Sequence, residues 1–148
     1  MASHDFVKSG LRTVEMEALA VSQLTHFIDS DFEAACKTIL ACEGRVVVTG
    51  MGKSGHIGNK IAATLASTGT PAFFVHPGEA SHGDLGMITK NDVVIAISNS
   101  GNTAEVITIL PLIKRLGIPL ISMTGAPESV LAQSACGNLN VSVTTEAC

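Results

Sequence analysis

Short apolar runs alternate with polar, glycine-rich turns and stretches of helical spacing along the chain after residue 44. The apolar runs are rich in β-branched residues, which is typical of buried strands. Strands are predicted at residues 45–49, 72–75, 93–98, 120–124 and 139–143. Helices are predicted at 55–67, 103–115 and 129–134, with a short one near 83–85, and Pro111 should kink or shorten the helix that contains it.

The first 42 residues carry apolar positions at helical spacing instead. Val14, Leu19 and Phe27 lie on a pattern that predicts a helix over residues 6–28. Asp31 is placed to cap a second helix that ends near residue 42. The chain is therefore expected to begin with two helices.

Regular alternation of strand and helix predicts right-handed crossovers and a parallel sheet with helices on both faces. We expect a three-layer α/β/α sandwich with a five-stranded parallel sheet, formed by one domain over residues 1–148. The sequence stops directly after the last predicted strand, where such a domain normally adds a covering helix. Ligands of these sheets bind beyond the carboxyl ends of the strands, so function is sought in the loops there.

The amino-acid composition favours some classes of protein and argues against others. Apolar residues make up 46% of the chain and charged residues 15%, a balance that favours a buried sheet and, in addition, an oligomer interface. The net charge of −4 and the lack of Trp, Tyr and basic runs argue against nucleic acid as a partner. Charged residues interrupt the N-terminal segment, so neither a signal peptide nor a membrane span is predicted, and a cytoplasmic location is expected. The scattered cysteines lack metal-ligand spacing and are expected to be reduced: Cys36, Cys42, Cys136 and Cys148.

Residues 50–55 follow the first predicted strand and read Gly-Met-Gly-Lys-Ser-Gly. Glycines at a strand-to-helix junction let the backbone approach an anion. A dinucleotide-binding fold would also place an acidic residue near the end of the second strand, where this chain has His76, and the P-loop pattern fails at Val47. We favour Lys53 as a cation for a phosphate or a developing oxyanion, over a solvated surface lysine.

Residues 98–103, Ser-Asn-Ser-Gly-Asn-Thr, end the third predicted strand and open a helix. Three hydroxyls and several free backbone N–H groups gather at one helix N-terminus, which suits a phosphate bound without an arginine. Ordinary capping by Ser100 or Thr103 needs only one hydroxyl, so phosphate binding is favoured. Glu105 lies in the first helical turn, where it could equally complement the helix dipole.

Two further segments carry candidate chemistry. The loop over residues 76–84 holds two histidines and two acids, without the spacing of metal ligands on a helix face. For His82 we favour a hydrogen-bonding or proton-transfer role over metal ligation, and a structural loop histidine is equally supported. Glu146, in a polar tail, has the pattern of a solvated carboxylate.

Five segments in order closely resemble bacterial arabinose-5-phosphate isomerases, which are built on the sugar-isomerase (SIS) domain. They are residues 50–58 (GMGKSGHIG), 66–71 (ASTGTP), 74–80 (FVHPGEA), 82–86 (HGDLG) and 98–101 (SNSG). The resemblance covers nearly the whole chain. It implies the SIS fold, the interconversion of ribulose 5-phosphate and arabinose 5-phosphate on the route to the Kdo sugar of lipopolysaccharide, no cofactor or metal, and a homodimer or homotetramer.

The resemblance also implies roles for single residues. An enzyme of this kind moves a carbon-bound proton through an enediol, which needs a base and a group that stabilises the enediolate oxygen. Which glutamate is the base stays open. The implied catalytic residues are Lys53, Glu105, Glu146 and His82, and the implied substrate-binding residues are Gly52, Ser54, Ser98, Asn99, Ser100, Gly101 and Thr103.

Two departures from the family bear on activity. Its members continue past the stretch matching residues 146–148 into a Ser/Thr-rich segment, a His-Pro-Gly-Gly motif and usually two CBS domains, and Asn102 stands where they often carry an acid. One alternative is therefore a non-catalytic regulatory domain that binds a sugar phosphate or a nucleotide sugar. Another is a different SIS enzyme, such as a phosphoheptose or amino-sugar phosphate isomerase, against which the loop at residues 76–80 argues.

Overall fold

A five-stranded parallel sheet forms the centre of the computed structural model, which describes residues 5–80 and 84–147. The strand order is β2-β1-β3-β4-β5, so the chain leaves β1 towards one edge and returns to the other side of it. The strands are β1 (Val46–Gly50), β2 (Ala72–Val75), β3 (Val93–Ile97), β4 (Leu120–Thr124) and β5 (Gly137–Asn140). The predicted parallel sheet is confirmed.

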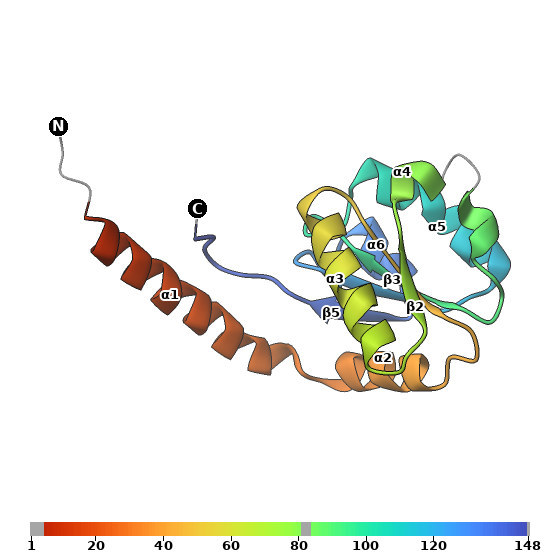
Figure 1. The fold of residues 1–148 in the computed structure, drawn as a ribbon, viewed down its shortest axis with the longest axis horizontal. Coiled ribbons are helices and arrows are strands. Elements are labelled where there is room, and N and C mark those ends of the chain that lie inside the picture. The colour runs from red at the N-terminus through yellow and green to blue at the C-terminus, as the bar shows by residue number, and fades with distance from the viewer. Residues whose placement is uncertain (1–4, 81–83, 148) are drawn as a thin grey trace.

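Helices cover both faces of this sheet (Figure 1). The helices of the described residues are α1 (Phe6–Gln23), η1 (Leu24–Phe27), α2 (Ser30–Leu40), α3 (Lys53–Ser67), α4 (Pro77–Ala80), η2 (Asp84–Met87), α5 (Ala104–Leu116) and α6 (Val130–Ser134). Helices α2 and α3 lie on one face, and α5 and α6 lie on the other.

Alternate residues of β1 point into two separate cores. Val46 and Val48 pack with Ala62 of α3, whereas Val47 packs with Ile109 of α5. All three valines are fully buried, as expected for a central parallel strand. The two cores on opposite faces make the three-layer α/β/α sandwich that the sequence predicts.

Several predicted boundaries are wrong by a few residues. Asp29, not Asp31, caps α2, because its extended backbone lets its carboxylate accept hydrogen bonds from the N–H groups of Asp31 and Phe32. The first helix ends at Gln23 and passes into the 3₁₀ turn η1.

Two further differences concern the C-terminal half. Helix α5 continues past Pro111 to Leu116 and ends at Gly117, which is left-handed (φ 67°). Strand β5 begins two residues earlier than predicted, because pairing of Gly137 with Ile121 of β4 sets its start, not the apolar residues that follow.

At the amino end of β3, the carboxylate of Asp92 ties three chain segments together. It accepts hydrogen bonds from the backbone N–H groups of Arg45 (2.8 Å) and Thr89 (2.7 Å), and the Arg45 guanidinium lies 3.6 Å away. Burial raises the pKa of Asp92, but these hydrogen bonds and the nearby cation outweigh burial and lower it below its usual value. Asp92 is therefore a structural carboxylate at the end of the sheet opposite the predicted site.

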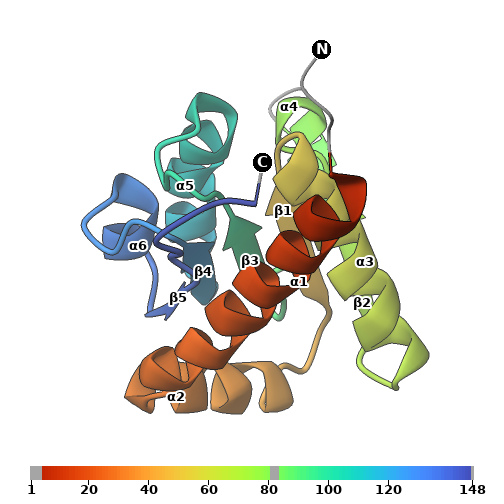
Figure 2. The same cartoon turned by 90° about the vertical axis from the view of Figure 1, so that its left-hand side faces the viewer.

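Helix α1 projects from the sandwich, as Figures 1 and 2 show from two directions. None of its residues is buried. Within residues 5–80 and 84–147, no helix combines the length and apolar character that crossing a bilayer requires.

Candidate functional site

The candidate site lies where β1 and β3 end side by side. Gly50, the last residue of β1, pairs with Ile97, the last residue of β3. In the sheet, β2 lies beside β1 and β4 lies beside β3, so the connections after β1 and β3 lead in opposite directions. In parallel α/β sheets this arrangement opens a ligand crevice at the strand ends. Each strand leads through a short loop into a helix, so the N-termini of α3 and α5 meet at one edge.

The loop after β1 is short and open. Gly52 has φ 58° and precedes α3 without any side-chain capping bond, and a Cβ there would meet nothing within 4 Å. Gly55 lets the helix begin close against the strand, because a Cβ there would lie 2.7 Å from the Gly50 carbonyl oxygen. Lys53, the first residue of α3, is exposed and has no hydrogen bond or ion pair with the described residues. Ser54 beside it is half-buried.

The loop after β3 is held by its own hydroxyls. Ser98 is 2% exposed, and its Oγ lies 2.8 Å from the Thr103 Oγ1 and accepts a hydrogen bond from the Gly101 N–H. Ser100 is exposed, and its Oγ accepts from the Asn102 N–H (3.3 Å). The loop thus keeps one hydroxyl inside and presents another to solvent.

The loop after β4 braces this segment from outside. The carbonyl oxygen of Asn99 accepts hydrogen bonds from the Thr124 hydroxyl and the Gly125 N–H, both at 3.0 Å. Gly101 has φ 63° and packs so tightly that a Cβ there would lie 1.9 Å from the Ser129 Oγ. Sequence reasoning missed these partners, although β4 follows β3 in the chain and two consecutive strands often pair.

Asn102 links the same two loops. Its side-chain oxygen accepts a hydrogen bond from the Val130 N–H at the start of α6 (3.2 Å), and its amide nitrogen donates to the Ser100 carbonyl (3.2 Å). At the position where the resembled family often carries an acid, this chain therefore has an amide that donates and accepts at once.

The first turns of α3 and α5 both lack a side-chain cap. Gly52 has no side chain to offer, and Thr103, the residue before α5, makes no capping bond because its hydroxyl is turned to Ser98. The alternative that Thr103 serves as an ordinary cap is therefore wrong. Two sets of helix N–H groups are left at one edge of the sheet, which is a favourable position for an anion.

The remaining candidate residues are Glu105, the loop histidines His76 and His82, and Glu146. Glu105 is exposed in the first turn of α5, on the same edge as Lys53. His76 is half-buried, and its Nδ1 accepts a hydrogen bond from the Gly78 N–H (3.2 Å). His82 lies outside the described residues. Glu146 is exposed on the C-terminal tail, which runs from β5 towards the side of the molecule where α1 lies (Figure 1).

Metal ligands do not cluster in this structure: within the described ranges, no three His, Cys, Asp or Glu side chains are grouped so that they could hold an ion.

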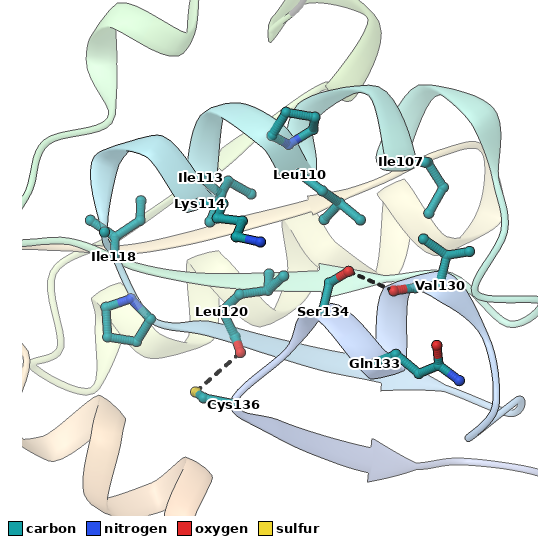
Figure 3. Close-up of a pocket in the computed structure, with 13 residues that line it drawn as sticks. Ile107, Leu110, Ile113, Lys114, Ile118, Leu120, Val130, Gln133, Ser134 and Cys136 are labelled. Carbon is teal, nitrogen blue, oxygen red and sulfur yellow. Dashed lines mark hydrogen bonds between the residues drawn. The ribbon is translucent and has the colours of Figure 1, made fainter.

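A hollow of about 640 Å³ lies elsewhere (Figure 3). Its lining is mainly apolar and comes from α5, α6 and the amino end of β4, including Leu110, Ile113, Ile118 and Leu120. Lys114 is the only cationic side chain in this lining, and none of the predicted site residues contributes to it. The strand-end loops, not this hollow, form the candidate site.

A protein-family model and individual known proteins both match this chain. The family model described as "SIS domain" matches residues 39–147. Arabinose 5-phosphate isomerase KdsD of Pseudomonas aeruginosa is 67% identical over 144 residues, and KdsD of Escherichia coli strain K12 is 55% identical over the same number of residues. In both cases the matched region is 97% of this chain but 44% of the relative, so the chain spans less than half the length of these proteins.

A solved structure extends the likeness to three dimensions. The Escherichia coli CFT073 protein c3406 in complex with arabinose 5-phosphate superposes with a TM-score of 0.89 at 46% identity, covering 100% of this chain and 79% of that one. The matched family model covers all five strands and both strand-end loops of the candidate site. The chain belongs to the SIS-domain family.

Proposed function

We propose that this chain is the catalytic sugar-phosphate domain of an arabinose-5-phosphate isomerase that interconverts ribulose 5-phosphate and arabinose 5-phosphate. The observation that carries the proposal is the pair of uncapped helix N-termini beside Lys53, in a chain 67% identical to KdsD. The product would feed the synthesis of Kdo for lipopolysaccharide, and the reaction would take place in the cytoplasm.

The phosphate is assigned to the loop after β3. The first-turn N–H groups of α5 and the exposed Ser100 hydroxyl face the solvent side of this loop, whereas Ser98 is engaged inside it. Ser98 and Thr103 thus shape the loop, and Ser100 contacts the ligand. Binding relies on hydrogen bonds and the helix dipole, because the loop itself carries no cationic side chain.

Isomerisation requires one proton to move between neighbouring carbons. From ribulose 5-phosphate a base removes a proton from C1, and the electron pair moves onto the C2 oxygen to give an enediolate. The hydroxyl proton then passes from the C1 oxygen to the C2 oxygen, the base returns its proton to C2, and the C1–oxygen bond becomes the aldehyde carbonyl, so no electrons are exchanged with a cofactor. Lys53 is assigned to the developing oxyanion, and Glu105 to the base, since its helix begins at the same edge of the sheet.

A non-catalytic sugar-phosphate-binding domain is the second candidate function. The observation in its favour is that Glu146 is exposed on the C-terminal tail and its side chain makes no hydrogen bond or ion pair with the described residues. In that case the loop after β3 would still bind phosphate, but the proton transfer would lack a group.

A coupled assay with ribulose 5-phosphate, run beside a binding titration of arabinose 5-phosphate, tests both functions. Lys53→Ala is expected to lower kcat by about 10²–10³, the usual cost of removing an oxyanion-stabilising group. Lys60→Ala, which removes an exposed cation from the same helix, is the matched control and should leave kcat unchanged. Binding without turnover in the unmodified chain selects the second function, and neither binding nor turnover contradicts both.

Glu105→Gln and Glu146→Gln distinguish the two candidate bases. The larger loss of kcat is expected from Glu105→Gln, since the backbone of α5 fixes that carboxylate near the phosphate loop. A larger loss from Glu146→Gln would assign the base to the tail instead. Far-ultraviolet circular dichroism of both variants controls for folding, because both side chains are exposed.

A further inference from the structure

Asn102 makes three hydrogen bonds in the loop after β3. Its backbone N–H donates to the Ser100 Oγ (3.3 Å), and its side-chain Nδ2 donates to the Ser100 carbonyl oxygen (3.2 Å). Its Oδ1 accepts a hydrogen bond from the N–H of Val130, the first residue of α6 (3.2 Å). One residue thus ties Ser100, which is exposed to solvent, to the first turn of a neighbouring helix.

The two hydrogen bonds to Ser100 act on the direction of its hydroxyl. A serine hydroxyl has one proton to donate and two lone pairs that accept. Because a lone pair of the Ser100 Oγ accepts the Asn102 N–H, the hydroxyl proton is left to donate to a bound anion. The bond from the Asn102 amide to the Ser100 carbonyl oxygen opposes backbone rotations that would turn this hydroxyl away. Asn102 therefore orients the hydroxyl that is assigned to the phosphate.

The third hydrogen bond anchors this arrangement to α6. The preceding residue, Gly101, is held by the same segment: its carbonyl oxygen accepts the Leu131 N–H (3.1 Å), and a Cβ on it would lie 1.9 Å from the Ser129 Oγ. Asn102 itself is exposed, so water can replace its side-chain hydrogen bonds and the fold should lose little without them. Its side chain therefore acts on the position of the loop more than on the stability of the protein.

The Asn102 amide is also uncharged, which matters because the loop has no cation. No residue from 98 to 104 carries a charged side chain. A carboxylate at position 102 could still accept the Val130 N–H, but it would have no proton to donate to the Ser100 carbonyl oxygen. It would also repel a phosphate monoester, which carries close to two negative charges above pH 7.

We propose that Asn102 is a positioning and selectivity residue of the phosphate loop. Its amide holds the Ser100 hydroxyl towards the ligand, and its neutrality lets a dianion bind to a loop without a cation. The inference rests on the proposed function, because it concerns the phosphate assigned to this loop. Since the phosphate is bound equally in the ground state and the transition state, Asn102 acts on KM and not on kcat.

Calorimetric titration at about pH 8 separates orientation from charge, with arabinose 5-phosphate as the dianion and arabinose 5-sulfate as a monoanion of the same sugar. Asn102→Ala removes the orienting bonds without adding charge and should weaken both ligands about threefold. Relative to Asn102→Ala, Asn102→Asp should weaken the phosphate by about a further tenfold and the sulfate by about threefold, because Coulomb energy is proportional to the ligand charge. Asn91→Asp adds the same charge at an exposed position beside the amino end of β3 and should leave both affinities unchanged.

The coupled assay with ribulose 5-phosphate supplies a second readout. Both Asn102 variants should raise KM in proportion to their loss of affinity and keep kcat within about twofold of the unmodified chain. Melting temperatures equal to that of the unmodified chain show that a lost affinity is not a lost fold.

Two results would overturn the proposal while leaving the proposed function intact. One is binding of arabinose 5-phosphate by Asn102→Asp as tightly as by the unmodified chain, and the other is an equal loss of phosphate and sulfate affinity in that variant. The affinities decide this whether or not the chain turns over. An unmodified chain that binds neither ligand would instead contradict the phosphate loop itself, and with it both proposals.

Discussion

The loops after β1 and β3 lie side by side but are built in opposite ways. The β1 loop is a glycine turn with open space around Gly52, and it ends in the exposed Lys53. The β3 loop is fixed by Ser98 from within and by the loop after β4 from outside. The difference indicates a division of roles, in which a rigid loop holds the phosphate and an adaptable cation follows the charge that develops during the reaction.

Alanine at Gly52 and Gly101, which have positive φ and lie one in each of these loops, should show the difference between the loops most strongly. Gly52→Ala brings only backbone strain, about 1–3 kcal/mol, because the space around it is open. Gly101→Ala adds overlap with Ser129, so its loss of unfolding free energy should exceed that of Gly52→Ala by about 2 kcal/mol. Urea denaturation of both variants measures the difference. Equal losses would show that the β3 loop is not braced as described.

Asp92→Asn tests whether the amino end of β3 contributes to stability independently of the site at its carboxyl end. It should lower the unfolding free energy at pH 7 by about 1.5–3 kcal/mol, the range for hydrogen bonds to a charged group. Because the folded pKa of Asp92 is lowered, its contribution is complete above the unfolded pKa of about 3.9 and is lost as pH falls through the folded value. The gap in melting temperature between Asp92→Asn and the unmodified chain should therefore close below about pH 4.

The affinity for arabinose 5-phosphate is the control for that prediction. Asp92 lies at the amino end of β3, one strand length from the phosphate loop. At pH 7 and a temperature where the variant is folded, Asp92→Asn should bind the sugar phosphate as the unmodified chain does. A weakened affinity would show that the two ends of the strand are coupled.

Alanine substitutions at Ser98 and Ser100 in the β3 loop should give the smallest effects, the first on the unfolding free energy and the second on ligand affinity. Ser98→Ala removes a buried hydroxyl with two hydrogen-bonded neighbours, so about 1 kcal/mol of unfolding free energy should be lost. Ser100→Ala should change the unfolding free energy by less than about 0.5 kcal/mol, since its hydroxyl is exposed. Only affinity should fall in Ser100→Ala, by up to about tenfold. Calorimetric titration with arabinose 5-phosphate measures the affinity. A larger loss of affinity in Ser98→Ala than in Ser100→Ala would assign the ligand contact to Ser98 instead.

Strand positions in the central sheet could be predicted from the sequence, because burial on both faces leaves a continuous apolar run. The prediction for residues 72–75 and 120–124 agrees with β2 and β4. The predicted bounds of β5 are displaced towards the C-terminus, because pairing with β4 fixes this strand and its residues include the polar Asn138 and Asn140. Local chemistry likewise could not choose between Asp29 and Asp31 as the cap of α2, because the choice depends on backbone conformation.

Candidate residues close to a strand end could be predicted, whereas the residues that support them could not. Lys53 and the segment 98–103 follow β1 and β3 directly, so the topology alone brings them together. Ser129 and Thr124 support that segment only because β4 is the next strand in the sheet, and no sequence motif marks them. The free face of α1 also depends on where the helix points, which its amphipathic pattern does not reveal.

The isolation of α1 from both cores makes its amide protons a reporter on neighbouring molecules. Hydrogen exchange in β1 and β3 requires the sandwich to open, whereas α1 has no buried residue that ties it to the sandwich. Its amides should therefore exchange nearly as fast as those of a free peptide in dilute solution. Slow exchange there, at any concentration, measures contact with another molecule and not the stability of the fold.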